Sequence, residues 1–413
     1  MDEAPAESAS PFAVAAFRRW AFFRLASTLG GQVQMLALGW YVYGLTGRPM
    51  SLAYVGLAQF LPVISLVLVT GHAADRFDRR AILSACSVAQ AASALTFMAL
   101  ARDGGRHLGA AYALCVVLGV SRAFWGPASQ SLVPSLVPAP ALPRALAFSA
   151  SLWQFGTIAG PALGGLLLAA PTGVPGGFAV AAALALASAA LAPTLKPRRP
   201  PPKVGSASWE TLLAGVRYVR AQPLLLACVS LDLFAVLLGG ATALLPVYAR
   251  DVLHVGARGL GLLRAAPSAG ALAMALWLAF RPLGRRAGLK MLGSVFAFGL
   301  LTVAFGVSRN VYVSLAALAL LGAADMVSVV VRQTLVQVRT PEAMRGRVSA
   351  VNQVFVGASN ELGEFESGAT AALLGAVPAV VLGGLGTCLV VACWAWLFPE
   401  LRRVDRLDHR TIP

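Results

Sequence analysis

Twelve long apolar runs, separated by charged residues or by glycine and proline, constrain this chain more than any other feature. A helix that crosses a bilayer needs about 20 consecutive apolar residues. The composition agrees, because 58% of the 413 residues are hydrophobic and only 12% are charged. An ordinary soluble enzyme is therefore excluded, and we expect an all-α membrane protein with twelve transmembrane helices. The predicted spans are residues 20–45, 50–71, 81–101, 108–129, 144–169, 174–194, 222–247, 258–280, 288–307, 311–336, 347–374 and 377–398.

The longest polar connection lies in the middle of the chain and contains a basic, proline-rich segment at residues 196–203. Proline makes such a linker stiff. An even number of spans with a central linker predicts two six-helix halves and places both termini on one side of the membrane. The predicted segments are a disordered cytoplasmic tail (1–15), an N-terminal half (16–195), a cytoplasmic linker (196–221), a C-terminal half (222–400) and a cytoplasmic tail (401–413).

The net charge of the chain is +16, and its basic residues are unevenly distributed among the loops. The termini and the even-numbered loops hold 23 of the 33 Lys and Arg residues, whereas the odd-numbered loops hold six. Positive charge accumulates on the cytoplasmic side of membrane proteins, so we expect a multi-pass protein of the plasma (inner) membrane with cytoplasmic termini. A nucleic-acid-binding surface is not favoured, because the charge is divided among seven short segments.

The two halves show a weak internal repeat at an offset of 203 to 205 residues. Pro62 then aligns with Pro267, and Gly160 aligns with Gly363. Such repeats are common in transporters. The repeat predicts two pseudo-symmetric parallel halves with a substrate cavity between them.

The loop after the second span reads GHAADRFDRR over residues 71–80. This resembles the G-x-x-x-D-R-x-x-R-R signature of the major facilitator superfamily of transporters. The family usually has glycine where Asp78 stands, and Asp tolerates a left-handed turn. The resemblance implies that Asp75 pairs with a nearby arginine or a second-half helix end and latches the cytoplasmic side, while the simpler interpretation is a topology anchor. The implied gating residues are Gly71, Asp75, Arg76, Arg79 and Arg80.

The fifth span contains GTIAGPALGG over residues 156–165. This resembles the G-x-x-x-G-P-x-x-G-G antiporter motif of exporters in the superfamily, which implies export. Glycines four residues apart form a smooth helix face for close packing, so plain helix packing is the alternative interpretation. The motif residues are Gly156, Gly160, Pro161, Gly164 and Gly165.

The resemblance covers residues 12–400 and is strongest to the branch that contains enterobactin (siderophore) exporters and macrolide or multidrug efflux proteins. The segments that carry it are 73–80, 127–133 and 158–165. The fourth span also resembles the family's R-x-x-Q-G-x-x-A pattern. Arg122 keeps the charge to which the family assigns proton transfer, but Trp125 replaces the glutamine.

Nine ionisable residues fall inside the spans. Each costs about 2.5–3.5 kcal/mol at the bilayer centre, so each needs a partner or a function. Glu361 and Glu364 share one helix face and should repel each other, which favours proton binding, whereas Glu366 should face elsewhere. The alternative is that the acids only neutralise Arg264 or Arg332. The candidates for proton coupling or for lining the cavity are Asp325, Arg332, Glu361, Glu364, Arg122, Asp232 and Arg24.

Tryptophan and glutamine side chains within the spans suit a large amphipathic, aromatic substrate. Helix packing and interface belts explain the tryptophans as well. The candidates for contact with substrate are Trp40, Gln59, Trp125, Gln130 and Gln154.

No P-loop, G-x-S-x-G or H-E-x-x-H motif is present, and the five cysteines and four histidines form no metal-binding pattern. We therefore expect no enzyme activity, catalytic residue, metal or cofactor.

The predicted function is export of a siderophore-like or drug-like molecule by alternating access with proton antiport. The expected partners are the lipid bilayer, a small-molecule substrate and protons, with the protein a monomer. The alternatives are an uptake carrier or lipid flippase of the same fold, or a non-transporting membrane sensor.

Overall fold

The computed structural model describes residues 10–104, 107–197, 209–281 and 283–405. These residues form helices joined by short connections, with no strand among them, which confirms the all-α prediction. The chain divides into two compact units. The first contains Met1–Tyr41 and Leu61–Ala207, and the second contains Val42–Phe60 and Ser208–Pro413. The ends of the first two long helices therefore belong to the second unit.

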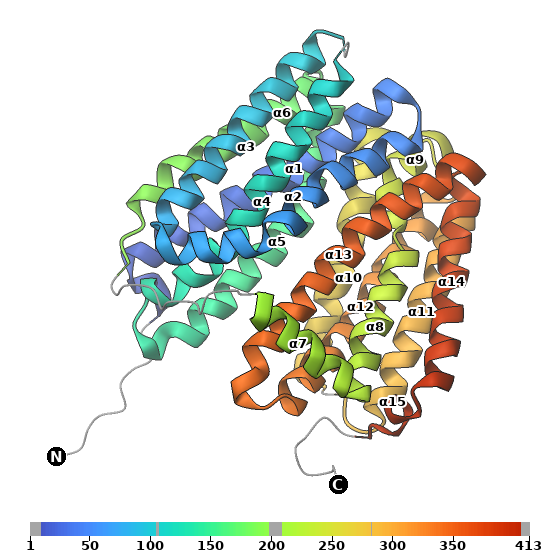
Figure 1. The fold of residues 1–413 in the computed structure, drawn as a ribbon. Helices are drawn as coiled ribbons and strands as arrows, with labels where there is room; N and C mark the ends of the chain where they lie inside the picture. Colours follow the sequence, from blue (N-terminus) through green and yellow to red (C-terminus); the bar gives the residue numbers. More distant parts are fainter. Residues whose placement is uncertain (1–9, 105–106, 198–208, 282, 406–413) are drawn as a thin grey trace, which may run out of the picture. The chain divides into compact units, whose positions relative to one another are not determined.

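The first unit holds most of α1 and α2 and all of the next four long helices (Figure 1). Three short 3-10 helices, η1 (Pro11–Ala13), η2 (Ala139–Ala141) and η3 (Ala192–Thr194), flank the long ones. The long helices are α1 (Ala15–Thr46), α2 (Pro49–Arg76), α3 (Arg79–Arg102), α4 (Leu108–Leu136), α5 (Leu142–Ala169) and α6 (Gly173–Leu191).

The second unit contains six long membrane helices and several short elements. The short ones are α7 (Trp209–Ala221), η4 (Ala241–Leu244), α9 (Leu245–Val247), the π-helix η5 (Tyr248–Val252) and α15 (Pro399–Arg403). The long ones are α8 (Pro223–Leu238), which continues through η4, α9 and η5, then α10 (Gly256–Phe280), α11 (Ala287–Val307), α12 (Val311–Arg339), α13 (Glu342–Leu374) and α14 (Ala376–Leu397).

Ten spans in the described part of the chain are long and apolar enough to cross a membrane. The helices α1 and α13 complete the predicted twelve. They are 32 and 33 residues long, but α1 also carries glutamines and arginines and α13 carries glutamates and arginines. The chain is thus a multi-pass membrane protein with the predicted twelve-helix architecture.

The same helix pairs form in both units. In the first, α3 packs along α6, and in the second, the equivalent helices α11 and α14 lie side by side (Figure 1). Gly160 of α5 approaches α1 closely, and its repeat partner Gly363 of α13 approaches α8, the equivalent of α1. This repetition supports the pseudo-symmetry predicted from the sequence.

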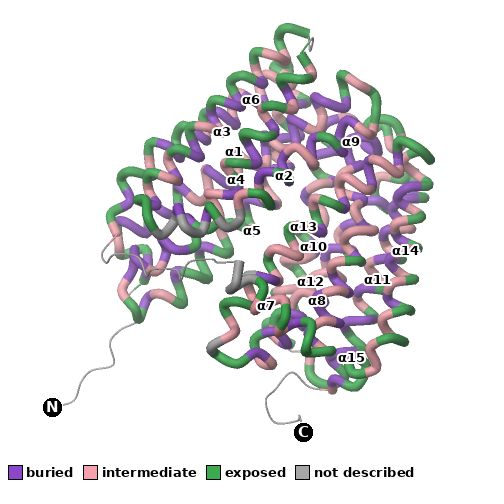
Figure 2. The backbone as a smooth tube through the Cα atoms, viewed as in Figure 1, coloured by how far each residue is buried: buried purple, intermediate pink, exposed green. Residues whose placement is uncertain are grey.

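The outer helices carry large exposed apolar side chains. On α14, buried turns alternate with exposed ones (Figure 2), and Leu382, Leu385 and Leu389 are exposed. A contiguous apolar surface of this kind is unfavourable in water. It suits lipid contact, as expected for a membrane-spanning helix.

Part of the predicted linker is a helix. Residues 209–221 form α7, which packs against α13. Val219 of α7 joins Val348 and Val351 of α13 in a small apolar cluster. The basic segment of the linker lies mostly outside the described residues.

The loop at Asp78 differs from our expectation. Asp78 has φ −62° and ψ 118°, so no left-handed turn forms there. The residue instead caps α3, because its carboxylate accepts a hydrogen bond from the Arg80 backbone amide (2.9 Å). An aspartate at this position satisfies one of the free amides at a helix start.

Candidate functional site

An ion pair deep in the second unit joins α8 and α12. The guanidinium of Arg332 contacts the carboxylate of Asp232, and the two residues are 3% and 4% exposed. Two opposite charges removed from water must compensate each other, since either one alone would be strongly unfavourable. The structure therefore selects Asp232 as the partner of Arg332, and the sequence alone did not.

A third charged residue lies near this pair. Asp325, two turns before Arg332 on α12, interacts electrostatically with both Asp232 and Arg332. It forms no ion pair with any side chain that the structure describes. The cluster therefore has two carboxylates for one guanidinium, and one added proton makes it neutral.

The acidic residues of α13 lie in two environments. A Cβ built on Gly56 of α2 would lie 3.5 Å from both Cβ and Oε2 of Glu364, so this glutamate packs against the second-unit part of α2. Glu366 instead accepts a hydrogen bond from the Thr370 hydroxyl on its own helix (2.8 Å). Glu361, one turn before Glu364, is half-buried. The different surroundings of Glu364 and Glu366 fit their expected separation around the helix.

In the first unit, Arg24 of α1 stacks on Trp125 of α4. The guanidinium carbon lies 4.7 Å from the centroid of the indole ring, which is within range of a cation–π interaction. Arg122, one turn earlier on α4, is exposed. The structure thus brings together two residues that the sequence placed in separate groups.

The glycine motif of α5 forms a close contact with α1. A Cβ built on Gly156 would lie 2.6 Å from Thr28 Cγ2, and one built on Gly160 would lie 2.5 Å from Gln32 Cβ. Both distances are too short for real atoms, so only glycine fits. Pro161, Gly164 and Gly165 are also buried. The motif therefore acts directly in helix packing within the first unit.

The loop motif is only partly described. The surroundings of Gly71 and the side chain of Asp75 lie outside the described set, so the latch expected at Asp75 remains a prediction. Arg76 is exposed and Arg79 is buried.

Beside this loop, Arg80 donates hydrogen bonds to Asp78 (2.7 Å from Nη2 to Oδ2) and to the carbonyl oxygen of Leu195 (3.3 Å). The Arg80 guanidinium holds the pKa of the Asp78 carboxyl below its usual range.

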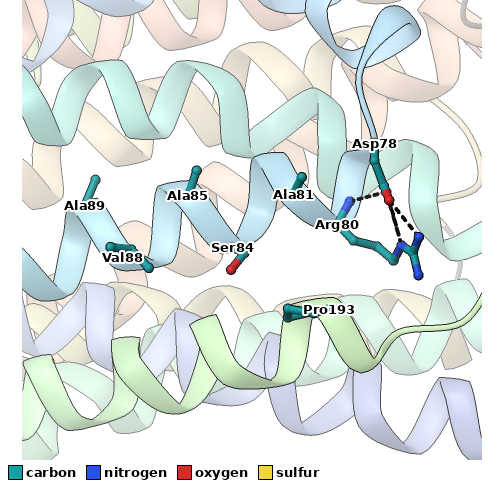
Figure 3. A pocket seen from close by; sticks show the side chains of 8 residues that line it. All are labelled: Asp78, Arg80, Ala81, Ser84, Ala85, Val88, Ala89 and Pro193. Atoms are coloured by element: carbon teal, nitrogen blue, oxygen red, sulfur yellow. Dashed lines mark hydrogen bonds and ion pairs between the residues drawn. The ribbon is translucent and has the colours of Figure 1, made fainter.

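This pair lies at one end of a groove of about 710 Å³ on the first unit (Figure 3). Small α3 side chains line the groove, and Pro193 of η3 lies opposite them (Figure 3). Its lining includes none of the charged residues predicted inside the membrane. The lining residues are Asp78, Arg80, Ala81, Ser84, Ala85, Val88, Ala89 and Pro193.

The predicted substrate-contact residues are in varied surroundings. Gln59 is buried (1% exposed), and its amide donates a long hydrogen bond to the Val55 carbonyl oxygen (3.4 Å). Trp40 and Gln154 are half-buried, and Gln130 is exposed. Trp125 is the member of this set that stacks on a charged residue, the Arg24 guanidinium.

The sequence did not reveal one polar contact in the second unit. The Tyr43 hydroxyl, near the end of α1, donates a hydrogen bond to the Asp251 carboxylate in η5. The two residues are 208 positions apart, so no local spacing could have indicated the pair. With the Gly56–Glu364 contact, it attaches residues 42–60 to the second unit.

A family model and individual relatives match this chain over most of its length. The family described as transmembrane secretion effector matches residues 6–412. The enterobactin exporter EntS of Shigella boydii serotype 4 is 28% identical over 379 residues, which cover 90% of this chain and 87% of that protein. EntS of Citrobacter koseri is 28% identical over 375 residues, with the same coverage.

Solved transporter structures share the fold. A bacterial homologue of the human lysosomal transporter Spinster has a TM-score of 0.74 at 12% identity and covers 98% of this chain and 100% of its own. A bacterial homologue of the iron transporter ferroportin has a TM-score of 0.69 at 17% identity, with 94% and 98% covered. These similarities show the fold of a transporter.

Proposed function

Because the chain belongs to the transmembrane secretion effector family of the major facilitator superfamily, we propose that this transporter exports an amphipathic small molecule by proton antiport. Relatives named enterobactin exporters support the direction and a siderophore-like or drug-like substrate. The proposal places the protein in the plasma (inner) membrane as a monomer with both termini in the cytoplasm. The count of Lys and Arg on the two sides supports that orientation.

The observation that carries proton coupling is the cluster of Asp232, Arg332 and Asp325. Asp232 is paired with Arg332, which leaves the Asp325 carboxylate as the uncompensated charge. A charge in a low-dielectric interior is unfavourable, so a proton on Asp325 stabilises the cluster. Release of that proton changes the interactions between α8 and α12. A bound proton shifts a conformational equilibrium only if the two states bind it differently, so the proposal requires the α8–α12 contact at this cluster to differ between the two states.

Gradient-driven transport in everted membrane vesicles tests the proposal. With a panel of siderophore-like and drug-like compounds, an imposed proton gradient should drive accumulation of at least one compound in vesicles that contain the protein. Asp325→Asn should abolish this accumulation. Glu366→Gln is the matched control, because Glu366 accepts a hydrogen bond from Thr370 on its own helix. This variant should transport normally. Absence of gradient-driven accumulation for every compound would contradict antiport.

Glu364→Gln tests the second acidic group in the same assay. We expect gradient-driven movement to be lost, because glutamine has no carboxyl group to bind a proton. Substrate binding should remain, because glutamine keeps the size of the side chain that packs against α2. Normal transport by this variant would remove Glu364 from the proposed mechanism.

Uptake on the same fold is the competing function. The buried glycine motif of α5 resembles that of exporters, which favours export. Vesicles of known orientation separate the two, because an uptake carrier would accumulate substrate in right-side-out vesicles instead.

A further inference from the structure

Arg24 and Trp125 form a cationic and aromatic surface inside the first unit. Arg24 lies in α1, Trp125 lies in α4, and the guanidinium stacks on the indole. Both residues are half-buried, so each retains access to its surroundings. A cation stacked on an aromatic ring at membrane depth is a costly arrangement that needs a function or a compensating charge.

No compensating charge is found in the described part of the first unit. Arg24 forms no ion pair there, whereas Arg332 in the second unit is paired with Asp232. Asp78 forms an ion pair with Arg80. Asp103 is exposed and lies beside His107.

Two N–H donors at this contact also lack acceptors. Arg24 Nε and Trp125 Nε1 are both buried, and neither has a hydrogen-bond partner among the described residues. A buried donor without an acceptor is unfavourable, and one oxyanion could accept from both donors and balance the positive charge. The contact therefore has the charge, the donors and the flat apolar surface that an aromatic anion needs.

We infer that Arg24 and Trp125 bind the exported substrate through an anionic group, a carboxylate or an acidic phenol, attached to an aromatic ring. This inference rests on the proposed export function and adds the chemical class of the substrate. The planar guanidinium binds the oxyanion with directional hydrogen bonds, and the indole contacts the ring. A neutral analogue of the same shape leaves the Arg24 charge uncompensated and binds more weakly.

Binding of two matched probes, 2-naphthoate and its neutral amide 2-naphthamide, tests the inference on the full-length protein in lipid nanodiscs. We expect saturable binding of 2-naphthoate that is at least tenfold tighter than binding of 2-naphthamide. Arg24→Gln should weaken 2-naphthoate binding at least tenfold and leave 2-naphthamide unchanged. Arg24→Lys, which keeps the charge, should restore part of the affinity, and Trp125→Leu should weaken both probes.

Arg102→Gln is the control for simple loss of charge, since Arg102 is exposed at the end of α3, and it should bind both probes normally. Thermal unfolding and size-exclusion profiles establish that each variant is folded. Equal binding of the two probes, unchanged binding of 2-naphthoate by folded Arg24→Gln, or no saturable binding by the wild type would overturn the inference.

The outcome is distinct from failure of the proposed function, because this binding assay uses no proton gradient. Charge-selective binding that depends on Arg24, without gradient-driven transport, would contradict antiport alone. Gradient-driven export that is unchanged in Arg24→Gln for every anionic compound would contradict the inference alone.

Discussion

The carboxylate of Asp232 on α8 is paired with the guanidinium of Arg332 on α12, and both side chains are almost completely buried. The two residues come from separate helices and are 100 positions apart. Their pairing fixes the contact between these helices, and it leaves the neighbouring Asp325 carboxylate without an ion pair in the described part of the chain. The charge balance of the second unit therefore depends on this pair.

Removal of one partner should destabilise the protein strongly. Asp232→Asn removes the carboxylate that the Arg332 guanidinium contacts, and breaking a buried ion pair typically costs about 3–5 kcal/mol. We expect a clear decrease in the thermal unfolding midpoint of the purified protein. The double variant Asp232→Leu with Arg332→Leu should recover most of the stability, because an apolar pair needs no charge compensation. A single variant as stable as the wild type would contradict this description of the pair.

The close contact between α1 and α5 predicts a second effect. Gly160→Ala places a Cβ against Gln32, and overpacking of this kind typically costs about 1–3 kcal/mol. The unfolding midpoint should fall and transport should be impaired. Gly126→Ala is the matched control, since a Cβ there meets no atom within 4 Å. Equal midpoints for the two variants would show that the α5 motif does not require glycine at this position.

The hydrogen bond from Tyr43 to Asp251 predicts the stability of residues 42–60 within the second unit. Tyr43→Phe removes a hydrogen bond to a charged acceptor, which contributes about 1.5–3 kcal/mol. Hydrogen exchange of the backbone amides in 42–60 should become faster. Tyr312→Phe, at a tyrosine that is 79% exposed, should leave this exchange unchanged. The same exchange rates in wild type and Tyr43→Phe would mean that the bond does not hold the segment.

The Asp78–Arg80 pair predicts a dependence on pH. Hydrogen bonds from Arg80 lower the pKa of Asp78 in the folded protein. The ionised carboxylate therefore stabilises the fold above its unfolded pKa of about 3.9, and this contribution is lost as the pH falls through the lower folded value. It should be at most about 1 kcal/mol, because the pair is partly exposed.

A stability comparison of wild type with Asp78→Asn between pH 3 and pH 7 measures this contribution. The difference should be constant above about pH 5 and should decrease on acidification as the carboxylate is protonated. A difference that grows as the pH falls would have the wrong sign for a carboxylate with a lowered pKa.

The sequence was sufficient to predict the architecture. Apolar runs, and the charged, glycine and proline residues that separate them, can be recognised from short stretches of sequence. The spans, the repeat and the close-packing glycines of α5 all follow from spacing along the chain. The repeat even identified Gly363 as the equivalent of Gly160, and both glycines lie at close helix contacts.

The polar contacts were harder to predict, because they depend on which helix faces meet. The spacing of Asp325 and Arg332 showed that they share a face, but it could not show that Asp232 from another helix pairs with Arg332. The Tyr43–Asp251 bond was missed for the same reason. At Asp78 the error was local, because the sequence was compared with a glycine turn, whereas an aspartate that precedes a helix also predicts a cap.

Separation of substrate exchange from net transport in Asp325→Asn proteoliposomes tests the central claim most directly. Exchange of labelled for unlabelled substrate needs no net proton movement, whereas gradient-driven export does. If the Asp325 carboxylate carries the coupling proton, the variant should exchange substrate at close to the wild-type rate and lose gradient-driven export. Gradient-driven export at the wild-type rate in this variant would contradict proton coupling through Asp325.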